Sequence, residues 1–468
     1  MNKFLLIIAL IMTASCNQSN KEPEKQPSMV HLITLDPGHF HAALVQKSMY
    51  EGVDSVVRVY APEGNDLQLH LDRIKAFNTR TDNPTHWKEA VYSGTDFFEK
   101  MLEDNMIRLS ADTGTGWHGN VVMLAGNNQK KTNYILKSLE AGFSVLADKP
   151  MAINIENFEM LKKAFEKARE KNMLLYDIMT ERFEITTILQ RELSMMPEIF
   201  GVLEKGDPAK PAMVIESGHC FYKSISGNVL TRPAWFMDAS QQGEGIVDVT
   251  THLVDLVQWE CFPEKSLDYT KDILVHTAKR WPTNMTISQF KAITKLDSFP
   301  SYMKNNLLND TTLQVYSNGA INYEVGGVHA KVSVTWDYLA SGGNDTHYSM
   351  MRGTKANLII RQGSEQQYKP ILFLEPIAGD PGYDKILLDQ IKKVQAKYPG
   401  VGLKKENKVW EVIIPEKYKE GHEAHFAMVT RNFLGYLNKN HMPDWEVPNM
   451  LAKYYTTTKA LELALKAK

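Results

Sequence analysis

The stretch Gly142-Phe143-Ser144-Val145-Leu146-Ala147-Asp148-Lys149-Pro150 decides the fold of this chain. Residues 143–147 form a short apolar run, typical of a strand buried on both faces. Gly142 ends the helical pattern that precedes this run. Lys149 therefore follows the carboxyl end of a strand, which is where open α/β sheets bind their ligands. A buried strand that follows a helix and ends in a cation indicates a parallel sheet with a binding crevice at that edge.

Apolar runs and helical patterns alternate on both sides of this stretch. Further strands are expected at 30–35, 55–60, 120–125 and 174–179, and helices at 39–49, 87–104, 131–141 and 155–171. Strands that alternate with helices favour a parallel sheet with right-handed crossovers. We therefore predict an α/β domain over residues 30–178.

Residues 179–468 have a different pattern, with period-2 alternation in many segments. Strands are expected at 312–316, 320–324, 332–338 and 356–360, with turns at 317–319 and 341–344. Helices are expected at 247–259, 387–397, 423–437 and 447–465. We predict an α+β domain with a mostly antiparallel open sheet. A length of 468 residues agrees with two domains.

The composition is that of a globular protein, with 43% hydrophobic and 23% charged residues. A net charge of −2 gives no electrostatic reason to expect a nucleic-acid partner. After Cys16, the remaining cysteines are Cys220 and Cys261. One disulfide between them and two free thiols are both open at this point.

The N-terminus has the pattern of a targeting segment. Lys3 precedes an apolar run at 4–12, which is far shorter than the roughly 20 residues that span a bilayer. Small residues then lead to Cys16, which resembles the lipidated cysteine of a bacterial lipoprotein. We expect a signal peptide at 1–15, a flexible tether at 16–29 and a cell-envelope lipoprotein with a lipid anchor, either periplasmic or on the outer membrane.

A second stretch, Gly243-Glu244-Gly245-Ile246-Val247-Asp248-Val249-Thr250-Thr251-His252-Leu253-Val254-Asp255, carries the chemistry. Asp248 and His252 are four residues apart and share one helical face. With Lys149 they could remove a hydroxyl proton while hydride leaves the adjacent carbon. A plain helix pair and a metal pair are the alternatives. No third ligand has evident spacing, so no metal site is expected.

The two motifs, in this order, resemble those of the Gfo/Idh/MocA family of nicotinamide-dependent sugar and polyol oxidoreductases. Residues 148–150 resemble its Glu-Lys-Pro motif, and Trp235 with 243–255 resembles its Trp…Gly-Gly-Gly…Asp-x-Gly-x-His-x-x-Asp motif. The last hundred residues resemble the C-terminal extension of a Bacteroidetes subgroup. The resemblance implies that 30–178 is a Rossmann-type NAD(P)-binding domain and that 179–468 serves substrate binding and oligomerisation.

The resemblance also implies roles for particular side chains. His252 would be the general base, Lys149 would bond the reacting hydroxyl and the nicotinamide ribose, and Asp248 would bind a sugar hydroxyl and orient the imidazole. The implied cofactor is NAD or NADP, held tightly. The cofactor contacts would be Gly38, His39, Phe40, Glu63, Asn127, Asn128, Asp148, Lys149, Pro150 and Trp235. The substrate contacts would be Glu181, Arg182, His219, Tyr222, Arg232 and Asp248.

The glycine-rich turn departs from the family pattern. In place of Gly-x-Gly-x-x-Gly the chain has Asp36-Pro37-Gly38-His39-Phe40-His41, which keeps only Gly38. Asp36 and Pro37 are expected to cap and begin a helix. A carboxylate there would oppose a phosphate by about 3–4 kcal/mol at 4–5 Å and an effective dielectric near 20.

The function expected from these observations is hydride transfer at a secondary alcohol of a sugar, glycoside or polyol. One alternative is a redox-neutral, NAD-dependent enzyme that cleaves glycosides. Another is a non-catalytic carbohydrate-binding lipoprotein on a dehydrogenase scaffold, favoured by the altered glycine turn. A homo-oligomer is expected by analogy with the family.

Overall fold

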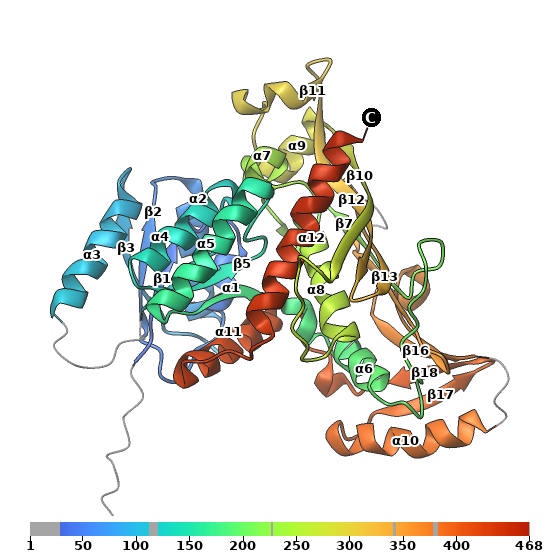
Figure 1. Cartoon of the computed structure of the whole chain (residues 1–468). Coiled ribbons are helices and arrows are strands. Elements are labelled where there is room, and N and C mark those ends of the chain that lie inside the picture. Colours follow the sequence, from blue (N-terminus) through green and yellow to red (C-terminus); the bar gives the residue numbers. More distant parts are fainter. Residues whose placement is uncertain (1–28, 112–119, 226–227, 340–342, 378–381, 468) are drawn as a thin grey trace, which may run out of the picture.

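The computed structural model describes residues 29–111, 120–225, 228–339, 343–377 and 382–467. The predicted signal peptide, Cys16 and nearly all of the tether lie outside these ranges. Two sheets organise the chain, one at each side of the molecule in Figure 1. Among the described residues, none of the helices combines the length and the apolar character needed to cross a membrane.

The N-terminal sheet has the order β3-β2-β1-β4-β5-β6, and all of its strands are parallel. This is the Rossmann order, in which the chain reverses direction across the sheet between β1 and β4 and ligands bind at that point. The strands are β1 (His31–Leu35), β2 (Val56–Ala61), β3 (Lys88–Ser93), β4 (Asn120–Leu124), β5 (Ser144–Asp148) and β6 (Leu175–Ile178). The helices are α1 (His41–Val45), α2 (Asn65–Thr79), α3 (Phe97–Ala111), α4 (Asn128–Glu140) and α5 (Ile155–Lys171). The predicted fold class is confirmed for this domain.

Two local predictions in this domain are wrong. The helix expected over 87–104 is a strand, β3, followed by α3. The strand escaped notice because β3 is an edge strand whose side chains are mostly exposed, so it lacks an apolar run. The helix expected at 39–49 shrinks to the five residues of α1, and its cap is Phe40 rather than Asp36. Asp36 instead adopts a left-handed backbone with φ of 49°, which turns the chain before the helix can begin.

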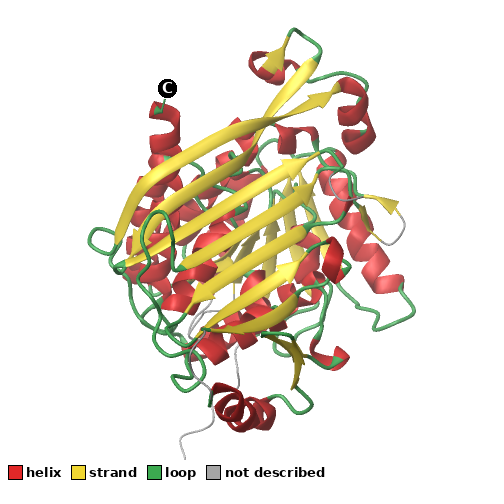
Figure 2. Ribbon diagram, turned by 90° about the vertical axis from the view of Figure 1, so that its right-hand side faces the viewer, coloured by secondary structure: helices red, strands yellow, loops and turns green. Residues whose placement is uncertain are grey.

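The second sheet has ten strands in the order β10-β12-β13-β7-β14-β15-β16-β18-β17, with β11 paired to β12. Its pairs are antiparallel except β13 with β7, so it is mixed and mostly antiparallel, as predicted. The strands are β7 (Met213–Cys220), β10 (Ile273–Thr286), β11 (Leu307–Leu308), β12 (Thr312–Val325), β13 (Val328–Asp337), β14 (Thr346–Arg352), β15 (Ala356–Gln362), β16 (Ile371–Pro376), β17 (Gly402–Glu406) and β18 (Val409–Ile413). A separate hairpin joins β8 (Ser224–Ile225) and β9 (Asn228–Val229). Figure 2 shows one face of the large sheet open, with helices behind the other face.

Helices of the second region cover the inner face of this sheet and extend from its edges. They are α6 (Ile185–Ser194), α7 (Ala239–Gln242), α8 (Thr250–Cys261), α9 (Ile287–Thr294), α10 (Tyr383–Lys397), α11 (His422–Lys439) and α12 (Glu446–Lys466). Short 3-10 helices include η1 (Thr180–Phe183), η2 (Ala234–Met237), η3 (Ser301–Asn306), η5 (Ser364–Gln366) and η6 (Glu416–Tyr418). Cys220 and Cys261 are not joined by a disulfide, so that alternative is not realised.

The turn predicted at 317–319 is wrong, because these residues lie inside the long strand β12. The glycine there serves close packing. A Cβ atom on Gly319 would lie 2.6 Å from Cβ of Ile246, and one on Gly245 would lie 1.7 Å from the carbonyl oxygen of Ser317. The backbone that leads into α8 therefore rests directly on β12, which fixes the position of Asp248 and His252. The second expected turn, 341–344, lies partly outside the described residues.

The last two helices return to the Rossmann domain. Phe426 and Phe433 of α11 and Tyr454 of α12 belong to the same apolar core as β1, β4 and β5. Figure 1 shows α12 running between the two sheets and α11 beneath the Rossmann domain. The C-terminal helices consequently join both regions and place α11 at the border of the crevice between them.

Candidate active site

An ion pair between the two regions marks the centre of the site. Lys149 follows β5, and its Nζ atom donates to Oδ1 of Asp248 at 2.6 Å. The second carboxylate oxygen accepts a hydrogen bond from Nε2 of Gln242 at 3.0 Å. Burial alone would raise the pKa of Asp248, but the charge and hydrogen bond of Lys149 bring it below its ordinary value. The pair is therefore charged, and it places an ammonium group over the end of the Rossmann sheet.

His252 supplies a neutral imidazole beside this pair. His252 is 9% exposed. Its burial, and to a smaller extent the charge of Lys149, lower the pKa of the imidazole to about 4. Its Nδ1 atom is buried and has no hydrogen-bond partner among the described residues. The charge of Lys149 acts on this pKa, so the two side chains lie within electrostatic reach of each other. No hydrogen bond joins Asp248 to His252 within the described structure, so Lys149 and Gln242, rather than His252, hold Asp248.

A wall of imidazoles around Glu181 borders the pocket. Glu181 lies in η1, and its Oε1 atom is 3.4 Å from Nδ1 of His422 in α11. Burial would raise the pKa of Glu181, but the hydrogen bond and charge of His422 and the nearby His252 and His347 hold it well below its ordinary value. The sequence analysis included Glu181 and missed His422 and His347. No sequence signal could have found them, because they come from α11 and β14, far along the chain.

Two predicted substrate contacts form a polar rim on β7 and after it. Nε2 of His219 is 2.7 Å from Oγ of Ser217, and Nδ1 is 3.5 Å from Oδ2 of Asp345. The His219 ring stacks on Trp336 with centroids 4.9 Å apart. Tyr222 packs against Tyr338 farther out. His219 thus presents a polar ring on an aromatic support, an arrangement suited to a sugar ring.

Arg232 is a buried cation near the same pocket. Its guanidinium lies 4.5 Å from the ring centre of Phe236, and its Nε atom donates to the carbonyl oxygen of Phe221. Burial lowers its pKa to about 10, while the charges of Asp345 and Asp248 oppose that shift. Arg232 is therefore within electrostatic reach of Asp248, and it lines the same small cavity as Gly38 and His39 of the Rossmann domain.

Arg182 lies elsewhere than expected. Its Nε and Nη2 atoms donate to both oxygens of Asp255 at 2.7 Å, and its Nη1 atom donates to Glu446 at 3.1 Å. Lys453 pairs with Asp255 at 2.8 Å and with Asp177 at 2.7 Å. All five residues are buried. This closed charge network joins β6, α8 and α12, so Arg182 and Asp255 connect the two regions, and the guanidinium of Arg182 is occupied by two carboxylates.

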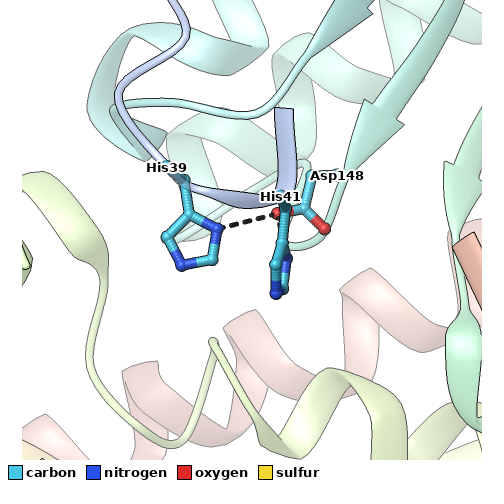
Figure 3. A group of neighbouring side chains, drawn as sticks. All are labelled: His39, His41 and Asp148. Carbon is cyan, nitrogen blue, oxygen red and sulfur yellow. Dashed lines mark hydrogen bonds and ion pairs between the residues drawn. The ribbon is translucent and has the colours of Figure 1, made fainter. Parts of the chain in front are cut away.

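Three side chains of the kinds that bind metal ions converge at the carboxyl ends of β1 and β5. His39 and His41 follow β1, and Asp148 is the last residue of β5. Nδ1 of His41 is 3.0 Å from Oδ2 of Asp148, and Nδ1 of His39 is 3.6 Å from the same oxygen. Figure 3 shows the two rings extending side by side toward the carboxylate. Lys131 of α4 donates from Nζ to the Asp148 carbonyl oxygen at 2.9 Å, and burial lowers its pKa to about 8. Burial lowers the pKa of His39 and of His41 as well, while the neighbouring Asp148 carboxylate opposes both shifts.

The space above Gly38, where the backbone of this fold approaches a dinucleotide, is covered. A Cβ atom on Gly38 would lie 2.9 Å from Cζ2 of Trp235 and 3.1 Å from Oδ2 of Asp66. The Trp235 indole nitrogen donates to that same carboxylate at 2.9 Å. The amides of Gly38 and His39 bond the carbonyl oxygens of Asp36 and Ala125. The turn is therefore closed by an indole from the second region.

Comparisons with known proteins place this geometry in a family. Residues 80–176 match a family described as "Oxidoreductase family, NAD-binding Rossmann fold". Residues 189–465 match one described as "Putative oxidoreductase C terminal domain". A crystal structure of a "putative oxidoreductase" from Parabacteroides merdae is 55% identical, has a TM-score of 0.89, and is matched over 94% of this chain and 98% of its own. The chain belongs to the Gfo/Idh/MocA oxidoreductases.

More distant members of this fold have been crystallised with nicotinamide cofactors. Levoglucosan dehydrogenase in complex with NADH and levoglucosan is 12% identical, with a TM-score of 0.56 over 94% of this chain and 98% of its own. GenD2 from gentamicin A biosynthesis, in complex with NAD, is 13% identical, with a TM-score of 0.54 over 98% of both chains. These likenesses concern the fold alone. A search of curated proteins found no match.

The residues of this oxidoreductase fit a nicotinamide cofactor at one end of the crevice. Lys149, Asp248 and the unpartnered ring of His252 converge where a nicotinamide and its ribose would lie at the carboxyl edge of the sheet. The Lys149–Pro150 bond is cis. At the other end, a pyrophosphate fits over Gly38 only after the Trp235 indole moves aside.

The other predicted cofactor contacts differ in whether they lie near the turn after β1. Glu63 is exposed after β2, and Asp66, which the sequence analysis missed, is the carboxylate that reaches the turn. Asn127 caps α4 and donates to Gln241, while Asn128 donates to the Gln242 carbonyl oxygen. Both therefore bridge to the second region.

Phe40 and Asp36 lie in the turn that follows β1. Phe40 packs beside the His39 and His41 rings. The Asp36 carboxylate accepts a hydrogen bond from Tyr134 at 3.2 Å. This bond directs Asp36 toward α4 rather than toward a helix cap.

Proposed function

We propose that this oxidoreductase transfers hydride at a secondary alcohol of a sugar, glycoside or polyol. The observation that carries the proposal is the buried Lys149–Asp248 pair beside the neutral, unpartnered His252. Two relatives of the same fold are named for a sugar derivative and for an aminoglycoside pathway. Glu181 and His422 in the wall of imidazoles, and His219 on the polar rim, supply the hydrogen-bonding groups that a polyhydroxylated ring requires.

The roles of the side chains follow from their charges. Lys149 carries its charge to the substrate hydroxyl and lowers the pKa of that hydroxyl. His252, which is neutral at physiological pH, accepts the hydroxyl proton as the carbon is oxidised. Asp248 holds Lys149 in place and leaves its own oxygens available to a neighbouring hydroxyl. A bound nicotinamide supplies the hydride acceptor, and the protein excludes water from the pocket.

Cofactor titration tests the proposal directly. The purified full chain is surveyed for nicotinamide absorbance and is then titrated with NAD and with NADP. We expect one of them to bind and to be reduced by at least one member of a panel of sugars, glycosides and polyols. Absence of binding by both cofactors would overturn the proposal and would favour a carbohydrate-binding protein on this scaffold.

One observation favours a second candidate, redox-neutral glycoside cleavage. Glu181 and His422, 3.4 Å apart, form another acid–base pair next to His252. After oxidation of a ring carbon, such a pair could remove a proton and protonate a leaving group. Release of free aglycone without net accumulation of reduced cofactor would distinguish this reaction from simple dehydrogenation.

We also propose a lipid anchor at Cys16 and an envelope location, either periplasmic or on the outer membrane. The support is the sequence pattern alone, since Cys16 lies outside the described residues. Metabolic labelling with a fatty acid, lost in Cys16→Ala, tests the anchor.

A homo-oligomer is proposed through the open face of the large sheet, and the mass in solution tests it.

A further inference from the structure

We propose that His39, His41 and Asp148 bind a divalent first-row transition-metal ion at the carboxyl edge of the Rossmann sheet, beside Lys149. The proposal goes beyond the function proposed above and does not depend on it. It departs from the sequence analysis, which expected no metal site. Spacing along the chain could not indicate this site, because Asp148 is 107 residues from His41.

The distances between the three side chains suit a shared ion. Metal–nitrogen and metal–oxygen bonds are about 2.0–2.2 Å, so neighbouring ligand atoms are about 3.0–3.5 Å apart. The two imidazole nitrogens lie 3.0 and 3.6 Å from Oδ2 of Asp148. One ligand atom from each residue falls within 4.8 Å of the other two. An ion between them therefore needs only small side-chain adjustments.

The hydrogen bonds among these three side chains leave one possible metal ligand, the imidazole of His39, without a hydrogen bond through its Nδ1 atom. His41 and Asp148 bond each other, but the Nδ1 atom of His39 is buried and has no hydrogen-bond partner among the described residues. Buried polar nitrogens are normally satisfied. The His39 side chain is 14% exposed, and its ring is held by stacking on Phe236. At 3.6 Å from Oδ2 of Asp148 this nitrogen is too distant for a hydrogen bond, and a shared ion would bind it more closely.

The donor set and its support select the class of metal. Two imidazoles and one carboxylate suit zinc, iron, cobalt or nickel better than magnesium or calcium, which prefer oxygen ligands. The Asp148 backbone is held by β5 and by Lys131, and the His39 amide is tied to Ala125. Three protein ligands leave at least one coordination position for water or for an oxygen of a bound molecule. That position would adjoin Lys149.

A second trio provides an internal control. His276, Glu324 and His329 also bring ligand atoms within 4.8 Å of one another. Their side chains are 29%, 32% and 19% exposed, and the imidazoles are 3.9 and 3.4 Å from Glu324. They lie on β10, β12 and β13, away from the Rossmann domain. Substitution in this trio controls for zinc held at any accessible histidine pair.

Zinc titration of the full chain, free of any histidine tag and stripped with a chelator, tests the site. We expect one tight equivalent by calorimetry and by elemental analysis. His39→Gln and His41→Gln should each weaken it by at least ~100-fold, since even second-shell changes cost 10–100-fold. His276→Gln should leave the tight equivalent unchanged. Cobalt in place of zinc should give a visible absorption band that His39→Gln abolishes.

Three results would overturn the site. They are no tight equivalent in the wild type, unchanged affinity in both His39→Gln and His41→Gln, or loss of the tight equivalent in His276→Gln. Circular dichroism confirms that each variant is folded, and His39→Gln keeps the test decisive should the buried His41 prove necessary for folding. Nicotinamide titration is performed separately on the metal-free protein. Zinc binding as expected without nicotinamide binding supports the site and overturns only the proposed function.

Discussion

Two buried clusters of charged side chains connect the Rossmann domain to the second region, and they differ in how completely their polar atoms are paired. The network of Asp177, Arg182, Asp255, Glu446 and Lys453 pairs each charge with at least one opposite charge. The crevice cluster pairs Lys149 with Asp248. It leaves Nδ1 of His252 and of His39 without a hydrogen-bond partner among the described residues.

The difference separates a structural role from a binding role. A buried charge network stabilises only when its members are fully paired and hydrogen-bonded. Unpartnered buried nitrogens are costly unless something binds to them. We therefore assign the first cluster to holding the two regions together and the second to a ligand. Each prediction below tests one side of this contrast.

The largest effect is expected in the crevice. Lys149→Met and His252→Asn, each shown to be folded by circular dichroism, should lower turnover by about 10²–10⁴-fold, because general acid–base groups contribute that much. Steady-state kinetics with the best alcohol from the panel measures this loss. Lys137→Met, on an exposed helix face, and His441→Asn, which is 68% exposed, are the matched controls. Full activity in either crevice variant would remove that residue from the chemistry.

The closed network should respond in stability instead. Lys453→Met leaves Asp177 and Asp255 without their shared cation, and we expect a loss of about 3–5 kcal/mol in the free energy of unfolding. Urea denaturation measures it. Lys459→Met, on the same helix and 44% exposed, should change stability by less than about 1 kcal/mol. An equal effect of the two substitutions would contradict the structural role of the network.

His70 is a third case that sharpens the contrast, since both of its ring nitrogens are buried without partners. Burial, then the charge of Arg73, lowers its pKa to about 3. The unfolded chain thus binds a proton below about pH 6.5 that the native protein refuses until about pH 3. Stability should therefore fall as the pH drops through this window, by up to ~1.4 kcal/mol per pH unit from this group.

His70→Gln should remove that slope. Urea denaturation at pH 4.5 and pH 6 compares the variant with the wild type, and His441→Gln serves as the exposed control. An unchanged pH dependence in His70→Gln would show that the ring is protonated at its ordinary pKa in the native protein.

The smallest effect is expected at the glycine turn. Asp66→Asn removes a carboxylate beside Gly38 and weakens its bond to Trp235, so nicotinamide cofactor should bind about tenfold more tightly. Glu63→Gln, at an exposed position, should change the affinity less than about twofold. Fluorescence titration measures both. Weaker binding in Asp66→Asn would instead make this carboxylate a cofactor contact.

Much of the fold follows from local sequence signals. The buried strands β1, β4 and β5 are apolar runs, and Lys149 at the end of β5 together with Asp248 and His252 marks the crevice. The edge strand β3 could not be found this way, because its side chains are mostly exposed. The Ser-Asn-Gly sequence in β12 was misleading, since the close packing of Gly319 against Ile246 requires glycine as strongly as a turn does.

The parts that failed depend on contacts between distant segments. Arg182 was predicted to bind substrate, and in the structure its guanidinium contacts Asp255 and Glu446, which lie 73 and 264 residues away along the chain. His422 reaches Glu181 only because α11 folds back against the Rossmann domain. Sequence spacing carries no information about such pairs, so the wall of the pocket could be described only from the structure.

The central claim is that Lys149 and His252 act together on one alcohol, and a double-mutant cycle tests it most directly. Hydride transfer is measured as nicotinamide absorbance under single turnover for the wild type, Lys149→Met, His252→Asn and the double variant. Groups that act as a unit are strongly non-additive, so we predict that the double variant is scarcely slower than either single variant. A double variant slowed by the full product of the two single effects would contradict the account.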